Sequence, residues 1–128
     1  MSEQKIMKPT ESELEILRVL WDKQKATVRE VHEVLSIYKD CGYTTTLKLM
    51  QIMHEKGLVK RDDSGKTHIY EALVSREKTQ KQLVDKMVNS LFGGSASQLV
   101  MQALGNNNSP SADELDEIQK LLDNLKKQ

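Results

Sequence analysis

Apolar residues recur at helical spacing up to residue 57, and this spacing predicts three short helices, each with one buried side. The first runs from about Thr10 to Lys23 and the second from about Thr27 to Tyr38. The third begins at Tyr43 or Thr44 and ends at Lys56, before Gly57, which suits the left-handed position that closes a helix. The predicted inward residues are Leu14, Leu17, Leu20 and Trp21, then Val28, Val31 and Leu35, then Thr46, Leu49, Met50 and Met53.

Three capping-box patterns mark where helices begin. In this pattern a hydroxyl residue is followed three positions later by a carboxylate, and the two side chains satisfy backbone N–H groups of the first helical turn. The pairs are Thr10 with Glu13, Thr27 with Glu30, and Ser111 with Glu114. Two of them agree with the first two predicted helices, and the third predicts a helix near the C-terminus.

After Gly57 the pattern becomes that of two short strands. Leu58 to Arg61 and Lys66 to Leu73 are predicted as strands, and Asp62-Asp63-Ser64-Gly65 as the turn between them. A helix that leads directly into a β-hairpin is the ending of a winged helix-turn-helix. Residues 8–74 are therefore predicted to form a winged-helix domain, in which the third helix commonly reads DNA.

Three further helices are predicted after residue 74, so the expected fold class is mainly α with a small β-hairpin. They run from Ser75 to Phe92, from about Ser95 to Leu104, and from Ser111 to about Lys126, with Gly93-Gly94 and the loop 105–110 between them. Their apolar faces exceed what they can cover alone, which predicts that residues 75–128 form a helical dimerisation region. Docking of these helices onto the N-terminal domain is the alternative. The residues assigned to dimerisation are Leu83, Met87, Leu91, Leu99, Val100, Leu104, Leu115, Ile118 and Leu122.

The outward face of the third helix carries side chains suited to a DNA major groove. Hydroxyls and glutamine can bond base edges, leucine can meet a thymine methyl group, and lysine can bind phosphate or guanine. A polar outer face is also what any amphipathic surface helix has, so both interpretations stay open at this point. The candidate base-contacting residues are Thr44, Thr45, Leu47, Lys48 and Gln51.

Lys60, Arg61 and Lys66 surround the tip of the predicted hairpin. On a wing, such cations contact the sugar-phosphate backbone and position the protein without reading sequence. The alternative is that they are solubilising charges on an edge hairpin. The neighbouring Asp62 and Asp63 favour this alternative mildly.

The net charge is zero, with 19 basic and 19 acidic residues, so the chain lacks the overall excess expected if phosphate binding were its whole role. The charges are distributed unevenly along the chain. Residues 39–66 contain six basic and four acidic side chains, whereas residues 11–33 contain four basic and six acidic ones. The charge balance supports a competing hypothesis, a winged-helix protein-interaction module that binds no DNA. A regulator with a small-molecule pocket also stays open.

Composition limits the other kinds of protein that this chain could be. The single cysteine, Cys41, excludes an internal disulfide and suits a reducing compartment. No apolar run approaches the ~20 residues that span a bilayer, and the N-terminus is too polar for a signal peptide, so a cytoplasmic protein is expected.

His32, His54 and His68 lie on separate elements without a catalytic motif, so we expect no enzyme, no cofactor and no metal site. A zinc site built from His32, His54 and Cys41 is the alternative.

Four stretches resemble the penicillinase-repressor family, which includes β-lactamase, methicillin-resistance and copper-responsive repressors of bacteria. They are TESELEILRVLW, YTTTLKLMQIMHEKGLVKR, GKTHIYEALVS and LFGGSASQLV, and the resemblance runs from about Lys8 to Lys126. It implies a homodimeric transcriptional repressor whose winged helix binds an inverted-repeat operator in double-stranded DNA. By the family pattern, the candidate base-contacting residues of the third helix lie at or beside positions that contact bases.

Two departures limit what the resemblance implies. Copper-responsive members end in paired cysteines, which are missing from the tail DELDEIQKLLDNLKKQ, so copper sensing is not expected. In β-lactam-responsive members, a sensor-linked protease cuts an Asn-Phe bond shortly after the double glycine. Gln102-Ala103 stands there in this chain. Relief of repression by proteolysis would need this bond or another one between Leu99 and Leu104.

Overall fold

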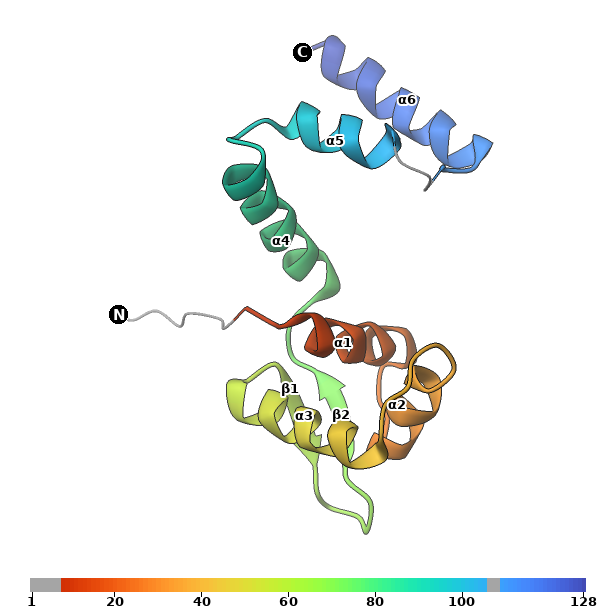
Figure 1. Ribbon diagram of the computed structural model, residues 1–128, viewed down its shortest axis with the longest axis vertical. Coiled ribbons are helices and arrows are strands. Elements are labelled where there is room, and N and C mark those ends of the chain that lie inside the picture. Colours follow the sequence, from red (N-terminus) through yellow and green to blue (C-terminus); the bar gives the residue numbers. More distant parts are fainter. Residues whose placement is uncertain (1–7, 106–108) are drawn as a thin grey trace, which may run out of the picture. The chain divides into compact units, whose positions relative to one another are not determined.

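A computed structural model describes residues 8–105 and 109–128 of the chain. It confirms the predicted fold class, because the described residues are mainly helical and include one antiparallel hairpin (Figure 1). The elements are α1 (Glu11–Lys23), α2 (Val28–Leu35), α3 (Tyr43–Lys56), β1 (Val59–Asp62), β2 (Ile69–Ala72), α4 (Arg76–Leu91), α5 (Ala96–Gly105) and α6 (Ala112–Lys126).

The chain divides into two compact units, one up to Gln80 and the other from Lys81 onward, so the division falls within α4. We call the described residues up to 80 the winged-helix unit, and those from 81 onward the C-terminal unit. The sequence placed the boundary at residues 74 and 75. Thr79, in the first turn of α4, is buried and belongs to the winged-helix unit.

All three predicted capping boxes are present. At the start of α1, the Thr10 hydroxyl accepts a hydrogen bond from the Glu13 amide at 3.2 Å, and the Glu13 carboxylate accepts one from the Thr10 amide at 2.9 Å. The same reciprocal bonds begin α2 and α6. At the other end of a helix, Gly57 closes α3 in the left-handed conformation (φ 83°), as its sequence position predicted.

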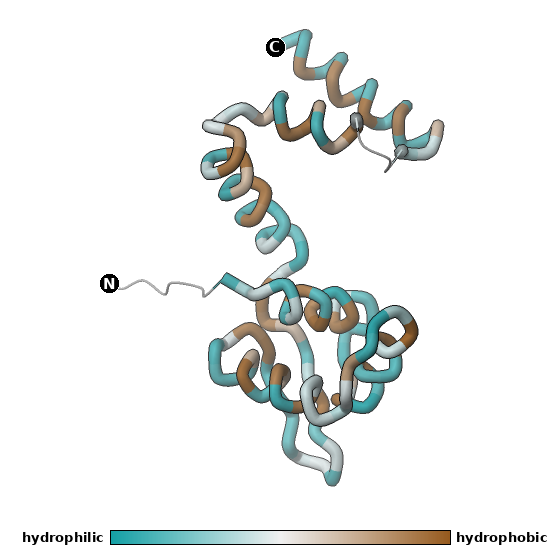
Figure 2. Tube along the Cα trace, viewed as in Figure 1, coloured by the Kyte–Doolittle hydropathy of each residue, from teal (hydrophilic) through white to brown (hydrophobic). Residues whose placement is uncertain are grey.

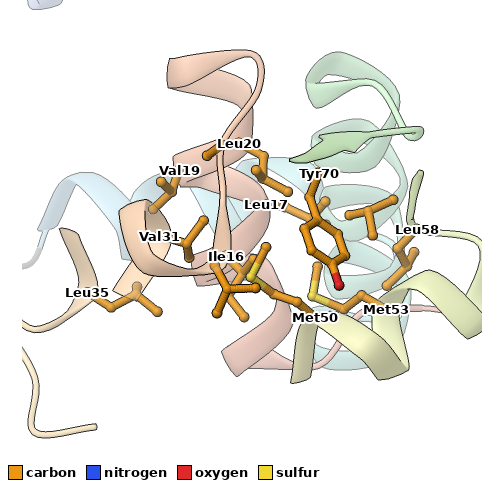
Figure 3. Packing of buried hydrophobic residues seen from close by; sticks show 13 residues of the cluster. Ile16, Leu17, Val19, Leu20, Val31, Leu35, Met50, Met53, Leu58 and Tyr70 are labelled. Atoms are coloured by element: carbon orange, nitrogen blue, oxygen red, sulfur yellow. The ribbon is translucent and has the colours of Figure 1, made fainter. Parts of the chain in front are cut away.

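One cluster of buried side chains from α1, α2, α3 and the hairpin forms the core of the winged-helix unit. Tyr70 is the largest of its fully buried side chains, and Figure 3 shows its ring beside Met50, Met53 and Leu58. The predicted inward stripe of α3 is confirmed, because Thr46, Met50 and Met53 are buried and Leu49 packs against the cluster. Two core residues of α1 were not predicted from the spacing, Ile16 and Val19.

The hairpin differs from its prediction in its second strand. β1 and β2 pair from Val59 opposite Ala72 to Asp62 opposite Ile69, so β2 begins at Ile69 rather than at Lys66, and the connecting loop is 63–68. The Asp62 carboxylate accepts hydrogen bonds from the amide and hydroxyl of Ser64. This local turn ends the strand ladder early.

Two further corrections concern hydrogen bonds that periodicity does not reveal. Ala26, before α2, exchanges backbone hydrogen bonds with Tyr70 at 2.8 and 3.0 Å and so adds a bridge to the free side of β2. Helix α2 ends at Leu35 instead of Tyr38. After Leu35 the amides of Ile37 and Tyr38 donate to carbonyls three residues earlier, both at 3.2 Å, so the α-helical pattern of bonds four residues back stops there.

In the C-terminal unit, α4 ends before Gly93-Gly94, as predicted, and is followed by α5 and α6. No side chain of its described residues is buried. Figure 2 shows apolar positions along all three helices. Residues 106–108 of the predicted loop lie outside the described residues. No helix in the described part of the chain is long and apolar enough to cross a membrane.

Candidate nucleic-acid interface

Helix α3 presents its hydrophilic flank to solvent. Thr44, Thr45, Lys48 and Gln51 are exposed, while the opposite side of the helix lies in the core. Leu47 differs from the other candidates, because it is half-buried and packs against the core cluster. The sequence placed all five together on the outward face. The structure leaves four of them fully available to a ligand.

The C-terminal end of α3 is tied to the start of α1 by a buried ion pair. Lys56 Nζ lies 2.7 Å from Glu13 Oε1, and only 3% of the Glu13 side chain is exposed. Burial acts to raise the pKa of Glu13, but hydrogen bonds from Lys56 and Thr10 outweigh it, and the pKa is lowered. The charged carboxylate therefore holds α3 at a fixed place on α1.

The N-terminal end of α3 has properties that suit an anion. Its N-cap, Gly42, supplies no side-chain hydrogen bond, and its first turn contains no acidic residue. The first N–H groups of a helix carry a partial positive charge, equivalent to roughly half an elementary charge in total. A phosphate beside this end would be attracted and would accept hydrogen bonds.

An open groove of about 330 Å³ lies where the N-terminal ends of α2 and α3 meet the hairpin. It contains cations from two elements, Arg29 of α2 and Lys66 of the hairpin loop, and no acidic residue lines it. We call it the basic groove. Its lining residues are Thr27, Val28, Arg29, Tyr43, Leu47, Lys66, Thr67, His68 and Tyr70.

The sequence did not select Thr27, Arg29, Tyr43 and Thr67 of this groove as candidate DNA contacts. The sequence contains one signal for Arg29. This residue lies in the first turn after a capping box, so a cation stands at a helix N-terminus. Tyr43 also contacts His32, edge to face, with 5.8 Å between ring centroids. No sequence pattern indicates that these side chains share a groove with the hairpin loop.

The three cations predicted for the wing lie in different surroundings. Hydrogen bonds with Tyr70 and then Asp63 raise the pKa of Arg61, whose Nε lies 2.8 Å from Asp63 Oδ1. Lys60 Nζ lies 3.5 Å from Glu71 Oε1. Lys66 is exposed on the loop and lines the basic groove, and no acidic side chain of the described residues forms an ion pair with it. Lys66 is therefore the wing cation best placed to meet a phosphate.

The histidines and the cysteine do not form a cluster with metal-binding geometry among the described residues. His32 lies on α2 and His54 on α3, while His68 belongs to the hairpin loop. Cys41 is partly buried and packs against the core cluster. Its side chain therefore acts in packing in this structure.

The residues assigned to dimerisation have their side chains exposed or half-buried in the C-terminal unit. Leu91 is 73% exposed, and so is Met101, which was not among the predicted residues. On α6 the apolar residues Leu115, Ile118, Leu122 and Leu125 follow the 3-4-3 spacing of a coiled-coil seam. These faces have no apolar partner within the described residues of their own unit that buries them.

Comparison with known proteins identifies a family and a fold for this chain. A family model described as penicillinase repressor matches residues 9–124. The methicillin resistance regulatory protein MecI of Staphylococcus aureus (strain N315) is 23% identical over 111 residues, covering 87% of this chain and 89% of that protein. The transcriptional regulator BlaI of Mycobacterium tuberculosis (strain CDC 1551 / Oshkosh) is 30% identical over 108 residues, covering 83% and 76%. The solution structure of the DNA binding domain of the repressor BlaI matches the fold with a TM-score of 0.51 at 22% identity, over 58% of this chain and 90% of that one.

Proposed function

The chain belongs to the penicillinase-repressor family of transcriptional repressors, and on this basis we propose that it is a cytoplasmic bacterial homodimer that occupies an inverted-repeat DNA operator. One observation carries the proposal: the exposed hydrophilic flank of α3 lies beside the basic groove. In this proposal the protein represses by occupancy, because the bound dimer blocks polymerase at the promoter.

Helix α3 enters the major groove and supplies the base contacts. Thr44, Thr45, Lys48 and Gln51 have the exposure that such contacts need. Lys48 can donate to guanine or to phosphate, and Gln51 can form two hydrogen bonds with adenine. Leu47 reaches a thymine methyl group only with the part of its side chain that the core leaves uncovered.

The basic groove takes the sugar-phosphate backbone. Arg29 and Lys66 supply charge, and Thr27, Tyr43 and Thr67 supply hydroxyl donors. Lys60 and Arg61 contribute less, because each already has a carboxylate partner within the hairpin. These contacts fix the position of α3 on the duplex without reading sequence.

The C-terminal unit makes the dimer in this proposal. Its three helices expose apolar side chains that a second copy of the chain would cover, and a two-fold axis would then place two α3 helices about one DNA turn, ~34 Å, apart. An inverted-repeat operator has the matching symmetry.

In this proposal, proteolysis or another signal that acts on the C-terminal unit relieves repression. Gln102 and Ala103, the predicted region for a sensor-linked protease, are exposed on α5. The bond between them lies inside a regular helix, and a protease needs an extended chain. Cleavage there would therefore require local unfolding of α5. Another signal that disrupts the same helices would also separate the dimer.

Selection of bound duplexes from a random DNA pool tests the function. The expected result is an enriched palindrome, and recovery of no preferred sequence would contradict the proposal.

The competing function is a protein-interaction module, which the zero net charge favours. The two are separated by titrating random duplex: DNA binding is detectable at low salt and falls steeply as salt rises, whereas an interaction module shows no such binding.

A further inference from the structure

The short segment between β2 and α4 makes hydrogen bonds with other elements of the winged-helix unit. Leu73 N donates to the Leu58 carbonyl at 2.9 Å, and the Trp21 indole N–H donates to the Val74 carbonyl at 3.0 Å. Ser75 Oγ then accepts a hydrogen bond from the Lys78 amide at 3.0 Å, which caps the new helix. These bonds hold the residues between β2 and α4 in place within the winged-helix unit.

Arg76 extends this attachment onto the first turn of α4. Its Nη2 atom lies 2.6 Å from Asp22 Oδ1, and its guanidinium lies 5.6 Å from the centroid of the Trp21 ring. One turn further along, Thr79 is 5% exposed. Trp21 and Asp22 belong to the last turn of α1. The start of α4 is therefore fastened to the end of α1 by a hydrogen bond, an ion pair and a cation–π contact.

We propose that the contact of Arg76 with Trp21 and Asp22 sets the direction of α4 and thereby determines which half-site spacing the dimer accepts. The inference rests on the proposed function. A 16-residue helix is about 24 Å long. A swing of about 10° at its start would move its far end by ~4 Å, which is comparable to the ~3.4 Å step between base pairs. A small change at the junction is thus enough to favour a different spacing.

The test compares duplexes that carry two copies of the selected half-site at the preferred spacing and at spacings one and two base pairs longer or shorter. Arg76→Asp and Asp22→Arg each break the ion pair, and the double variant restores it with the charges exchanged. Lys78→Asp is the matched control, because it reverses an exposed charge on the same helix.

Each single variant is expected to bind the preferred spacing about threefold more weakly, the size of one exposed ion pair, and Arg76→Asp also loses the cation–π contact. Its affinity should vary less with spacing than that of the parent, while binding to a duplex with a single half-site is unchanged. The double variant should regain the spacing dependence of the parent. A purely structural role would weaken single-site and two-site binding alike.

Fluorescence gives a second measurement that needs no DNA. Trp21 is the one tryptophan of the chain, so its emission reports directly on the junction. Arg76→Asp should shift the emission, and Lys78→Asp should not. Identical spacing profiles for the parent and the single variants would overturn this inference and leave DNA binding intact. Failure of the parent to bind any two-site duplex more tightly than a single site would overturn both the inference and the proposed dimeric repressor.

Discussion

The winged-helix unit and the C-terminal unit contain similar kinds of apolar residues but differ in where their side chains lie. In the first, Leu17, Val31 and Tyr70 are almost completely buried. In the second, Leu91, Leu121 and Leu125 are more than half exposed. Burial of one such side chain contributes roughly 1.5–3 kcal/mol, so the first unit can be stable by itself. The helices of the second need another surface to gain the same contribution.

The largest expected effect is on the free energy of unfolding, when one leucine is replaced by alanine in each unit in turn. Leu17→Ala should reduce the free energy of unfolding by about 2–5 kcal/mol, because it leaves a cavity in the core. Leu121→Ala should cost far less at protein concentrations where the chain is monomeric, because Leu121 is 58% exposed. Urea unfolding followed by Trp21 fluorescence measures the loss in the winged-helix unit, and far-ultraviolet circular dichroism measures the loss in the C-terminal unit. Equal losses in dilute protein would show that the C-terminal unit has a core of its own.

The second prediction concerns what covers the exposed helices. Leu122→Asp places a charge on the apolar seam of α6 and should weaken the dimer by at least about a hundredfold, or ~3 kcal/mol. Asn124→Asp is the control, since it adds the same charge at an exposed position outside the seam. Sedimentation equilibrium over a range of concentrations measures dimerisation. A parent chain that stays monomeric at all concentrations would contradict the proposal.

The elements of both units could be predicted because their signals are local. A capping box spans four residues, and an apolar stripe repeats every three or four. The hydrogen bonds that position the elements are not local. Glu13 and Lys56 are 43 residues apart, and Trp21 and Val74 are 53 apart. Such pairs depend on how the helices cross, which periodicity does not specify.

The candidate site also has one part that the sequence predicts and one part that it does not. Exposure of Thr45, Lys48 and Gln51 follows from the period of α3 and could be predicted from the sequence. The basic groove could not be, because it is assembled from α2, α3 and the hairpin loop. Arg29 and Lys66 come together there only in the folded chain.

The third prediction makes one lysine substitution in each unit. Lys48→Ala should cost about 1–3 kcal/mol of binding to the selected duplex, because the proposed function gives Lys48 a base contact. Lys120→Ala, which removes an exposed lysine of α6, should leave DNA binding unchanged. A gel-shift titration measures both affinities. Unchanged binding by Lys48→Ala would remove this residue from the base contacts.

The fourth prediction concerns the ion pair that fixes α3 within the winged-helix unit. Glu13→Gln should lower the free energy of unfolding by about 1–2 kcal/mol at pH 7, because Lys56 loses its carboxylate partner. Glu30→Gln is the control, since Glu30 forms the same capping box on the exposed surface. Thermal unfolding of both variants measures the difference.

The pH dependence of the same variant gives an independent measurement. The pKa of Glu13 is lowered in the folded chain relative to its ordinary value of 4.5. Its charged form therefore stabilises the fold fully above pH 4.5, and this contribution is lost as the pH falls through the lowered pKa. The parent and Glu13→Gln should converge in stability in that acidic range. A constant difference down to pH 2 would contradict the role given to the carboxylate.

The smallest expected effect separates two lysines of the hairpin. Lys66 lines the basic groove, whereas Lys60 already lies near Glu71. Lys66→Ala should reduce the slope of log affinity against log salt by about 0.9, the value for one phosphate contact, and should weaken binding to all duplexes alike. Lys60→Ala should change the slope less, because its charge is partly neutralised in the free protein. Equal changes for both variants would show that DNA displaces Glu71 from Lys60, and an unchanged slope for Lys66→Ala would remove the hairpin loop from the backbone contacts.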